Sequence, residues 1–246
     1  KLGLVAAFDT GTTLRASYTT LFDYTARGGI GQLEPTFVGG FNQLYDALSG
    51  TDQELFALGL DQKIANSSFI GGDVLYRKLS LKMPVFDGGF SFDRATGDLA
   101  DRIFEGTDAG SAEISRSDLY YYQVLREDLV LALDYAWEYF NEESVLPDTS
   151  TNRVQAALRY FHPSGVFAQI SPVWRYQERG GDIAPKTTSN FVMLDMGLGY
   201  EFAARRGRVQ FDLLNVTDYN FEYSPITDEQ QIFPRIGGLL SARYNF

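Results

Sequence analysis

Apolar and polar residues alternate with a period of two along most of this chain, which is the pattern of half-buried β-strands. The clearest segment is 129–140, whose odd positions are leucines, tyrosines and a tryptophan. Helical periodicity is scarce. The pattern therefore predicts an all-β protein of about eleven strands, at 3–9, 12–22, 53–64, 68–82, 117–126, 129–142, 152–162, 166–178, 190–203, 207–221 and 234–246. Because Pro172 cannot donate a hydrogen bond to a neighbouring strand, we predict a β-bulge there.

The connections between these strands alternate between short and long. Short connections rich in turn-forming residues occur at 9–12, 65–68, 126–128, 162–165 and 204–207. Long ones occur at 23–52, 83–116, 143–151, 179–189 and 222–233. A β-sandwich has no reason to sort its loops in this way, whereas an outer-membrane barrel has tight periplasmic turns and long extracellular loops. We therefore expect residues 1–246 to be one segment of an antiparallel, up-and-down transmembrane β-barrel.

The two faces of the predicted strands differ in chemistry. The apolar faces often end in aromatic residues, as expected for the girdles at the two membrane interfaces. A soluble barrel with one wet face would explain the alternation alone, but not these aromatic ends or the sorted loops. The opposite faces carry charges of both signs in mid-strand, and in a barrel such side chains set the field that a solute meets. The candidate lumen-facing residues are Arg15, Asp73, Arg77, Asp134, Glu138, Arg153, Arg159, Arg175, Asp195, Glu201, Asp212 and Arg243. The alternative is that these charges only satisfy one another in a wet interior.

Composition excludes several classes of protein. The chain has no cysteine, so disulfide frameworks, thiolate catalysis and cysteine-based metal sites are ruled out. Its net charge is −11, which argues against nucleic acid as a partner. The acidic residues of 87–118 do not follow the spacing of an EF-hand, and we interpret them as a solvated loop beside lipopolysaccharide rather than a metal site. We expect no cofactor.

One pair of residues suggests catalysis. His162, the only histidine, lies two residues before Ser164 in a turn that also holds a proline and a glycine. A nucleophilic serine needs a third group that orients the histidine and donors that stabilise an oxyanion. Neither is evident in the sequence, so we expect that the chain is not an enzyme.

The number of strands also carries a prediction. If the last strand runs toward the periplasm, the strand at 3–9 runs in the same direction, and its outer edge needs a partner. An unpaired strand edge in lipid costs several kcal/mol for each bare backbone group. We therefore expect that further strands precede Lys1 in the native protein, or that another chain supplies them.

Short stretches near the C-terminus resemble a known family. The segment from Asp212 to Phe221 resembles the penultimate-strand signature of TonB-dependent outer-membrane receptors, in which a turn like Asn-Leu-Phe-Asp follows an alternating strand and precedes an aromatic residue. The ending with Tyr244 and Phe246 resembles the C-terminal signal that the barrel-assembly machinery reads. Residues 33–43 and 159–165 resemble a plugless subgroup in which a similar barrel is fused to tetratricopeptide repeats.

The resemblance implies a C-terminal barrel segment of a transport protein in the outer membrane of a Gram-negative bacterium. A receptor barrel of this kind has about 22 strands, and the chain shows no plug, TonB box or helical repeats. The preferred interpretation is a conduit for solute uptake whose loops 23–52 and 83–116 gate it or capture ligand. The alternatives are a plugless export or scaffold barrel linked to periplasmic repeats, and a structural anchor of a surface assembly. The implied partners are outer-membrane lipid and lipopolysaccharide, the barrel-assembly machinery, and TonB or periplasmic repeat proteins.

Overall fold

The computed structural model describes residues 1–23, 37–42, 51–84, 106–142, 147–181, 184–202, 206–219 and 235–244. Most of them belong to one antiparallel sheet of 11 strands, hydrogen-bonded in the order in which they follow along the chain. These strands are β1 (Leu2–Ala7), β2 (Thr12–Asp23), β5 (Thr51–Ala65), β6 (Ser68–Pro84), β7 (Gly106–Arg126), β8 (Leu129–Glu142), β9 (Thr149–Phe161), β10 (Val166–Gly181), β11 (Ala184–Phe202), β12 (Gly207–Leu214) and β13 (Gly237–Tyr244). Two short strands, β3 (Phe37–Val38) and β4 (Phe41–Asn42), form a separate hairpin.

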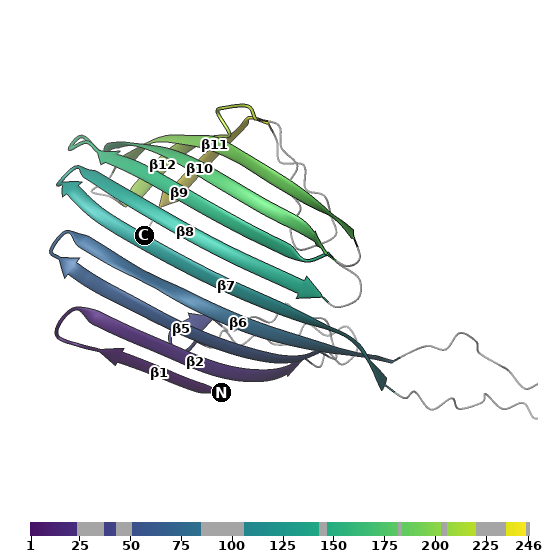
Figure 1. Cartoon of the computed structure of the whole chain (residues 1–246). Coiled ribbons are helices and arrows are strands. Elements are labelled where there is room, and N and C mark those ends of the chain that lie inside the picture. Colours follow the sequence, from purple (N-terminus) through teal and green to yellow (C-terminus); the bar gives the residue numbers. More distant parts are fainter. Residues whose placement is uncertain are drawn as a thin grey trace, which may run out of the picture.

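The sheet is a curved wall in which each strand lies beside its neighbours in sequence (Figure 1). The short turns gather at one end of the wall, on the left of Figure 1, and β6 and β7 extend furthest at the other end. Within the described residues, β1 and β13 each pair on one side only, so the wall is not closed. The described residues hold no helix with the length and hydropathy needed to cross a membrane. The predicted all-β, antiparallel, up-and-down fold is confirmed.

The strands that differ most from their predicted boundaries are β7, β11 and β12. β10 continues to Gly181 and β11 begins at Ala184 rather than at 190, so the long connection predicted at 179–189 is wrong. β7 begins at Gly106 rather than at 117. The prediction missed its first half because that half is rich in small and polar residues and shows no clear alternation. That half is held by its ladder to β6, which pairs Pro84 with Gly106 at the far end. β12 ends at Leu214 rather than at 221, because the next residue, Asn215, has a positive φ of 52° that a strand does not accommodate. The hairpin of β3 and β4 was not predicted at all.

The predicted β-bulge at Pro172 is wrong. The ladder between β10 and β11 runs in one register through the pair Pro172 and Leu194. On the other side, Ile170 pairs with Leu158 and Val173 pairs with Gln155, which is again a single register. The proline lacks an N–H group, so the ladder to β9 is interrupted here without the extra residue that a bulge requires.

The two faces of the sheet are distinguished by their exposure. On β5, Leu55 is 1% exposed, whereas Phe56 and Leu58 are 47% and 59% exposed. We call the face that carries Leu55 the inner face and the face that carries Phe56 the outer face. The outer face continues across the sheet with Leu60, Val74, Leu133, Val154, Leu158, Ile170, Val192, Leu198, Tyr200, Phe211 and Leu240, all of them exposed. So large a continuous apolar surface is typical of contact with lipid or with another protein.

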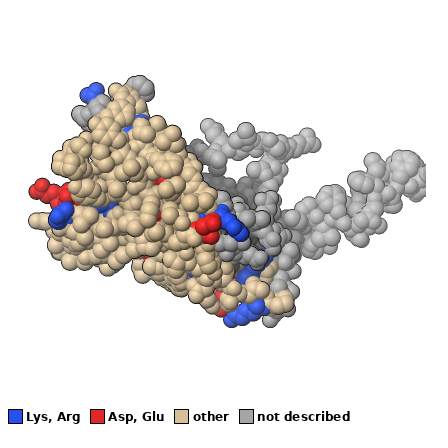
Figure 2. Space-filling view, turned by 90° about the horizontal axis from the view of Figure 1, so that it is seen from above, with Lys and Arg blue, Asp and Glu red and all other residues tan. Residues whose placement is uncertain are grey.

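Aromatic residues border this apolar surface toward both ends of the strands. Trp137 stacks on Tyr139, with ring centroids 6.4 Å apart, at the end of β8 that is remote from its short turn. Tyr200 and Phe202 stack at the same distance near the short turns. In Figure 2 the surface between the two ends is almost free of charged side chains, which gather at its borders. This distribution matches the apolar band and aromatic girdles of a membrane barrel.

Candidate functional site

The charged side chains of the inner face are ordered by the register of the strands. Residues directly opposite each other on antiparallel strands have Cβ atoms about 5 Å apart. The consecutive pairings place Arg15, Gly59, Asp73, Asp118, Ala136, Arg153, Arg175 and Phe191 side by side from β2 to β11. We call this set the inner row. On one side of Ala136 the row holds Arg15 and the two carboxylates Asp73 and Asp118, and on the other side it holds the two guanidinium groups of Arg153 and Arg175.

Arg15 is held between two carboxylates at the acidic end of the inner row. Its Nε lies 3.1 Å from Asp61 Oδ2, and its Nη2 lies 2.7 Å from Asp73 Oδ1. Tyr120 donates a hydrogen bond of 2.5 Å from its hydroxyl to Asp61 Oδ1. Gly59 makes this arrangement possible, because a Cβ atom there would lie 2.3 Å from Asp73 Oδ1. The network joins β2, β5, β6 and β7 across the inner face.

A second ion pair lies beside the first. On β7, Arg116 Nε lies 2.6 Å from Asp118 Oδ2, and Arg116 Nη2 donates to Asp118 Oδ1 at 3.1 Å. The two residues are two apart on one strand and therefore share its inner face. The sequence analysis counted Asp118 in an acidic loop, which is wrong because the residue lies in the middle of β7. The part of that acidic cluster at 87–105 lies outside the described residues.

The basic part of the inner row forms a hollow of about 200 Å³. Arg153 on β9 lies directly opposite Arg175 on β10. Arg116, Glu138 and Thr151 line the same hollow. Arg116 lies directly opposite Glu138, and Glu138 is paired in turn with Thr151. The hollow therefore brings three arginines and one glutamate together on the inner face.

The hairpin of β3 and β4 rests on the inner face over Arg15. The guanidinium carbon of Arg15 lies 5.1 Å from the ring centroid of Phe41, which is within range of a cation–π interaction. Phe41 is 8% exposed and packs with Leu55 and Ala57 in one apolar cluster. At Gly39, φ is +58°, and a Cβ atom would lie 2.1 Å from the carbonyl oxygen of Ala16. The predicted extracellular loop 23–52 therefore sends its described middle part onto the inner face.

Other predicted residues on the inner face make local hydrogen bonds. Arg77 is 3% exposed and donates from Nη2 to Gln53 Oε1 at 2.8 Å. Asp134 accepts a hydrogen bond of 3.0 Å from the hydroxyl of Tyr122. These contacts fix the side chains in place on the wall.

Toward the short turns, the predicted residues lie on β9 and β11 to β13. Asp212 Oδ1 accepts from Gln210 Nε2 at 2.6 Å. Glu201 Oε1 lies 3.8 Å from Arg208 Nη1, and Arg208 is directly opposite Arg243. The remaining two predicted positions here are Arg159, which pairs with Gln169, and Tyr244, which ends β13 opposite Gly207. Phe246, the other residue of the predicted assembly signal, lies outside the described residues.

Asp195 has a structural partner. Its Oδ1 accepts a hydrogen bond of 2.8 Å from the backbone N–H of Asn215, the residue that follows β12. The Asn215 side chain in turn donates to the carbonyl of Tyr219 at 3.0 Å and accepts from the hydroxyl of Thr217 at 3.0 Å. The turn that carries the resemblance to TonB-dependent receptors is thus closed by its own asparagine and tied to β11.

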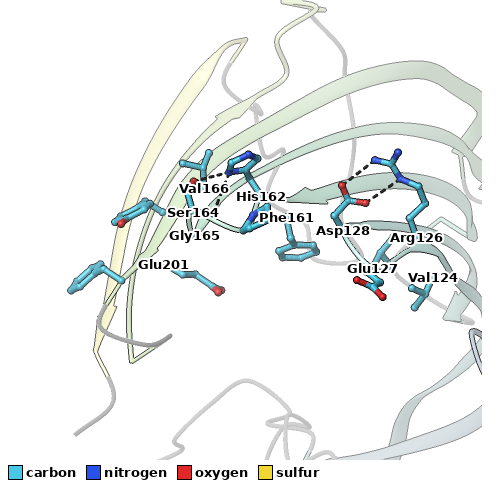
Figure 3. A pocket seen from close by; sticks show the side chains of 14 residues that line it. Val124, Arg126, Glu127, Asp128, Phe161, His162, Ser164, Gly165, Val166 and Glu201 are labelled. Atoms are coloured by element: carbon cyan, nitrogen blue, oxygen red, sulfur yellow. Dashed lines mark hydrogen bonds and ion pairs between the residues drawn. The ribbon is translucent and has the colours of Figure 1, made fainter.

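The short-turn end of the wall holds a wide hollow, about 1400 Å³ in volume, lined by two turns (Figure 3). One turn carries Arg126, whose guanidinium contacts Asp128 at 3.0 Å. In the other, His162 Nδ1 lies 2.8 Å from Ser164 Oγ and accepts a hydrogen bond of 3.2 Å from the Ser164 backbone N–H. The two side chains that the sequence analysis considered for catalysis are therefore in contact, in a turn that this contact stabilises.

Sequence reasoning missed two members of the network around Arg15, Asp61 and Tyr120, and it also missed Arg116 of the second ion pair. Asp61 shares the face of Gly59 and Ala57, so its alternation was visible, but it lies near the end of its predicted strand. Arg116 and Tyr120 fall at the start of a strand whose true extent the pattern did not reveal. Only the register shows that these residues meet Arg15 and Asp73.

No protein-family model matches the chain, and no curated protein matches it. Among solved structures, the chain is similar to OmpT, an outer membrane protein of Vibrio cholerae in its trimer form, with a TM-score of 0.54 and 13% sequence identity. That similarity covers 98% of this chain and 63% of OmpT, so the chain spans less than two thirds of that protein. FyuA, the ferric yersiniabactin uptake receptor of Yersinia pestis, matches with a TM-score of 0.39 and 13% identity over 98% of this chain and 40% of FyuA.

The expectation that the chain is not an enzyme, which rested on the lack of an orienting group and of oxyanion donors in the sequence, is wrong as a conclusion. The comparison with OmpT shows a shared fold, and a fold does not exclude an enzymatic function. At 13% identity the similarity concerns the fold alone, so it assigns no activity either. What the geometry and the comparison together establish is that the chain has the all-β, antiparallel, up-and-down fold of outer-membrane barrels.

Proposed function

We propose that this chain is part of a β-barrel in the outer membrane of a Gram-negative bacterium and forms part of a conduit for solute uptake, in the manner of TonB-dependent receptors. The observation that carries the proposal is the inner row of charges on a wall whose outer face is apolar. In a soluble protein, other parts of the protein would cover the apolar face, and the charged face would be exposed to bulk water.

The energetics of the inner face support an aqueous interior. Moving an ion from water into a medium of low dielectric costs several kcal/mol unless it is paired or hydrated. Arg15, Asp61 and Asp73 are 20%, 34% and 36% exposed at their side chains, so they are paired with one another and still reached by water. A solute that passes along this wall meets fixed charges whose strength water screens only in part.

The incomplete wall supports the proposal that further strands complete the barrel. β1 and β13 each lack a described partner on one side, and an open edge is not tolerated in lipid. We propose that upstream strands or another chain pair with these edges. Lipid and lipopolysaccharide would contact the outer face, the barrel-assembly machinery would insert the protein, and TonB or periplasmic repeat proteins would act at the short-turn end.

A structural anchor is the second candidate, and the docked hairpin favours it. Phe41 fills part of the inner face, and a barrel filled in this way would hold a surface assembly without conducting. A plugless export or scaffold barrel shares the architecture of the first proposal and differs from it in the direction of transport.

Conductance in planar lipid bilayers separates these functions. The whole protein, purified in detergent and added to one side of the bilayer, is expected to produce discrete current steps. Among the described residues, the Arg126 guanidinium bonds to Asp128 of its own turn, so an Arg126→Gln variant is expected to give the same current steps as the wild type. Insertion of the folded protein without any current step would reject the conduit and support the anchor.

A further inference from the structure

A hollow of about 310 Å³ opens on the outer face of the sheet above β7, and strands β5 to β8 all contribute to its lining. Ser117 of β7 lies directly opposite Val74 of β6 on one side and Trp137 of β8 on the other. Ser115, the next outward residue of β7, lies directly opposite Tyr76. Small side chains on one strand, with large ones on both neighbouring strands, leave a groove along the middle strand. We call this hollow the outer groove.

The walls of the outer groove are held by contacts outside it. Trp137 donates a hydrogen bond of 3.2 Å from Nε1 to Ser150 Oγ and stacks on Tyr139, with ring centroids 6.4 Å apart. On the opposite wall, Phe56 lies against Tyr18, with ring centroids 4.5 Å apart. Because these contacts fix both aromatic walls from outside, the outer groove is formed before anything fills it, as most ligand sites are.

The two ends of the outer groove differ in polarity. Toward the short turns, the outward residue of β7 that follows Ser117 is Leu119, which is 53% exposed. Toward the long connections, the outward residue before Ser115 is Glu113, directly opposite Lys78, and Lys78 is directly opposite Glu54 in turn. An occupant therefore has apolar surroundings at one end and charged neighbours at the other. An acyl chain joined to a polar head group has this character.

We propose that the outer groove binds an acyl chain of lipopolysaccharide. This inference rests on the proposed place of the chain in the outer membrane, where the long connections lie on the extracellular side. The outer groove lies beside Trp137 and Tyr139, at the border of the apolar band nearer those connections. Lipopolysaccharide forms the leaflet on that side of a Gram-negative outer membrane.

Continuity with the lipid-facing surface and the shape of the outer groove both favour an acyl chain. Phe56 and Leu58, which line it, are 47% and 59% exposed and belong to the apolar outer face. A lipid chain elsewhere on the outer face contacts protein on one side only. A chain in the outer groove contacts the floor and both walls, and the additional van der Waals contacts retain it there.

The two tryptophans of the chain provide the test, because only one of them lines the outer groove. Trp174 lies on β10, three strand spacings or about 14 Å from β7. The variant Trp174→Phe retains Trp137 as its single tryptophan, and Trp137→Phe retains Trp174. Each whole protein is reconstituted into vesicles of phosphatidylcholine with brominated acyl chains, whose bromine atoms quench the fluorescence of a tryptophan in contact with them. Lipopolysaccharide, or unbrominated phosphatidylcholine with the same number of acyl chains, is then added.

We expect lipopolysaccharide to restore the fluorescence of Trp137 about threefold more than that of Trp174, because it displaces brominated chains from the outer groove first. Unbrominated phosphatidylcholine should restore both equally. Ser117→Leu in the Trp174→Phe background fills the outer groove and should remove the preference for Trp137. Ala156→Leu is the matched control, because it adds the same side chain to the outer face of β9, opposite Leu133 and outside the groove. Circular dichroism establishes that each variant is folded, and Ser117→Val replaces Ser117→Leu if the latter does not fold.

Equal recovery of both tryptophans, or a preference that the folded Ser117 variant retains, would overturn the proposal. Selective recovery of Trp137 with phosphatidylcholine as well would show that the outer groove takes any acyl chain, and quenching of Trp174 without quenching of Trp137 would show that a protein segment covers it. Either result also overturns the assignment to lipopolysaccharide. If neither tryptophan is quenched, the outer face is not in lipid and the proposed function itself fails.

Discussion

Replacement of Ile170 by arginine tests the orientation of the whole wall. Ile170 is 40% exposed on the outer face of β10. It lies four residues from Trp174 in one direction and four from Val166 in the other, and Val166 is paired with Tyr200. With a rise of about 3.4 Å per residue and a strand tilt of about 40°, both aromatic levels are about 10 Å away along the membrane normal. Ile170 therefore lies near the middle of the apolar band.

An arginine at the bilayer midplane of a barrel costs about 2–4 kcal/mol, and the cost falls to about 0–1 kcal/mol near the interfaces. We expect Ile170→Arg to lower the free energy of unfolding by the full 2–4 kcal/mol. The assay is urea unfolding of the protein reconstituted into phospholipid vesicles, followed by tryptophan fluorescence. Removal of the isoleucine adds little, because its outward surface contacts lipid rather than a packed protein interior.

The neighbouring residue provides the matched control. Gln169 lies on the inner face of the same strand, with its Nε2 3.5 Å from Asp212 Oδ1. An arginine there has a carboxylate within reach and is offset by the repulsion of Arg159, which lies directly opposite. We expect Gln169→Arg to change the free energy of unfolding by less than about 1 kcal/mol. Equal losses at positions 169 and 170 would refute the assignment of the two faces.

Three further changes test the inner face and its supports. Arg15→Ala leaves Asp61 and Asp73 facing each other and should lower the free energy of unfolding by about 1–3 kcal/mol in the same urea assay, less than the loss of a fully buried pair because water reaches all three groups. Additional replacement of Asp61 by Asn should recover part of this loss, and no recovery would show that the charges do not interact. Asn215→Ala removes the side-chain hydrogen bonds of its turn and places alanine at φ 52°, so we expect the free energy of unfolding to fall by about 2 kcal/mol. Asn215→Gly should lose only the part that comes from the hydrogen bonds, and equal losses in the two variants would contradict a contribution from the backbone conformation. In Gly39→Val the hairpin of β3 and β4 cannot dock on the inner face, because the new Cβ would meet the Ala16 carbonyl. If the hairpin narrows the interior, we expect larger current steps in planar bilayers, and unchanged steps would show that it does not narrow it.

The sequence predicted the position of a strand accurately where the two faces of that strand differ clearly in chemistry. β8 was predicted at 129–142 and occupies the same range, because its leucines and aromatics alternate with small and charged residues throughout. The prediction failed at the first half of β7, where glycine, serine and threonine make neither face clearly apolar or clearly polar. It also failed at Pro172, because an outward-facing proline in a sheet can interrupt one ladder without adding a residue.

The sequence by itself determined the class of fold, the approximate strands and the side of each strand that carries charge. These properties depend on a local period of two, which most of the strands display. Tertiary structure alone decided which charges meet. Arg15 joins Asp61 and Asp73, and Arg153 faces Arg175, only because particular hydrogen-bond registers bring together residues from separate strands. The same holds for Phe41, whose place over Arg15 results from packing against a distant part of the sheet. A shift of two residues in any register would preserve the alternation of each strand but separate the charged residues that meet on the inner face.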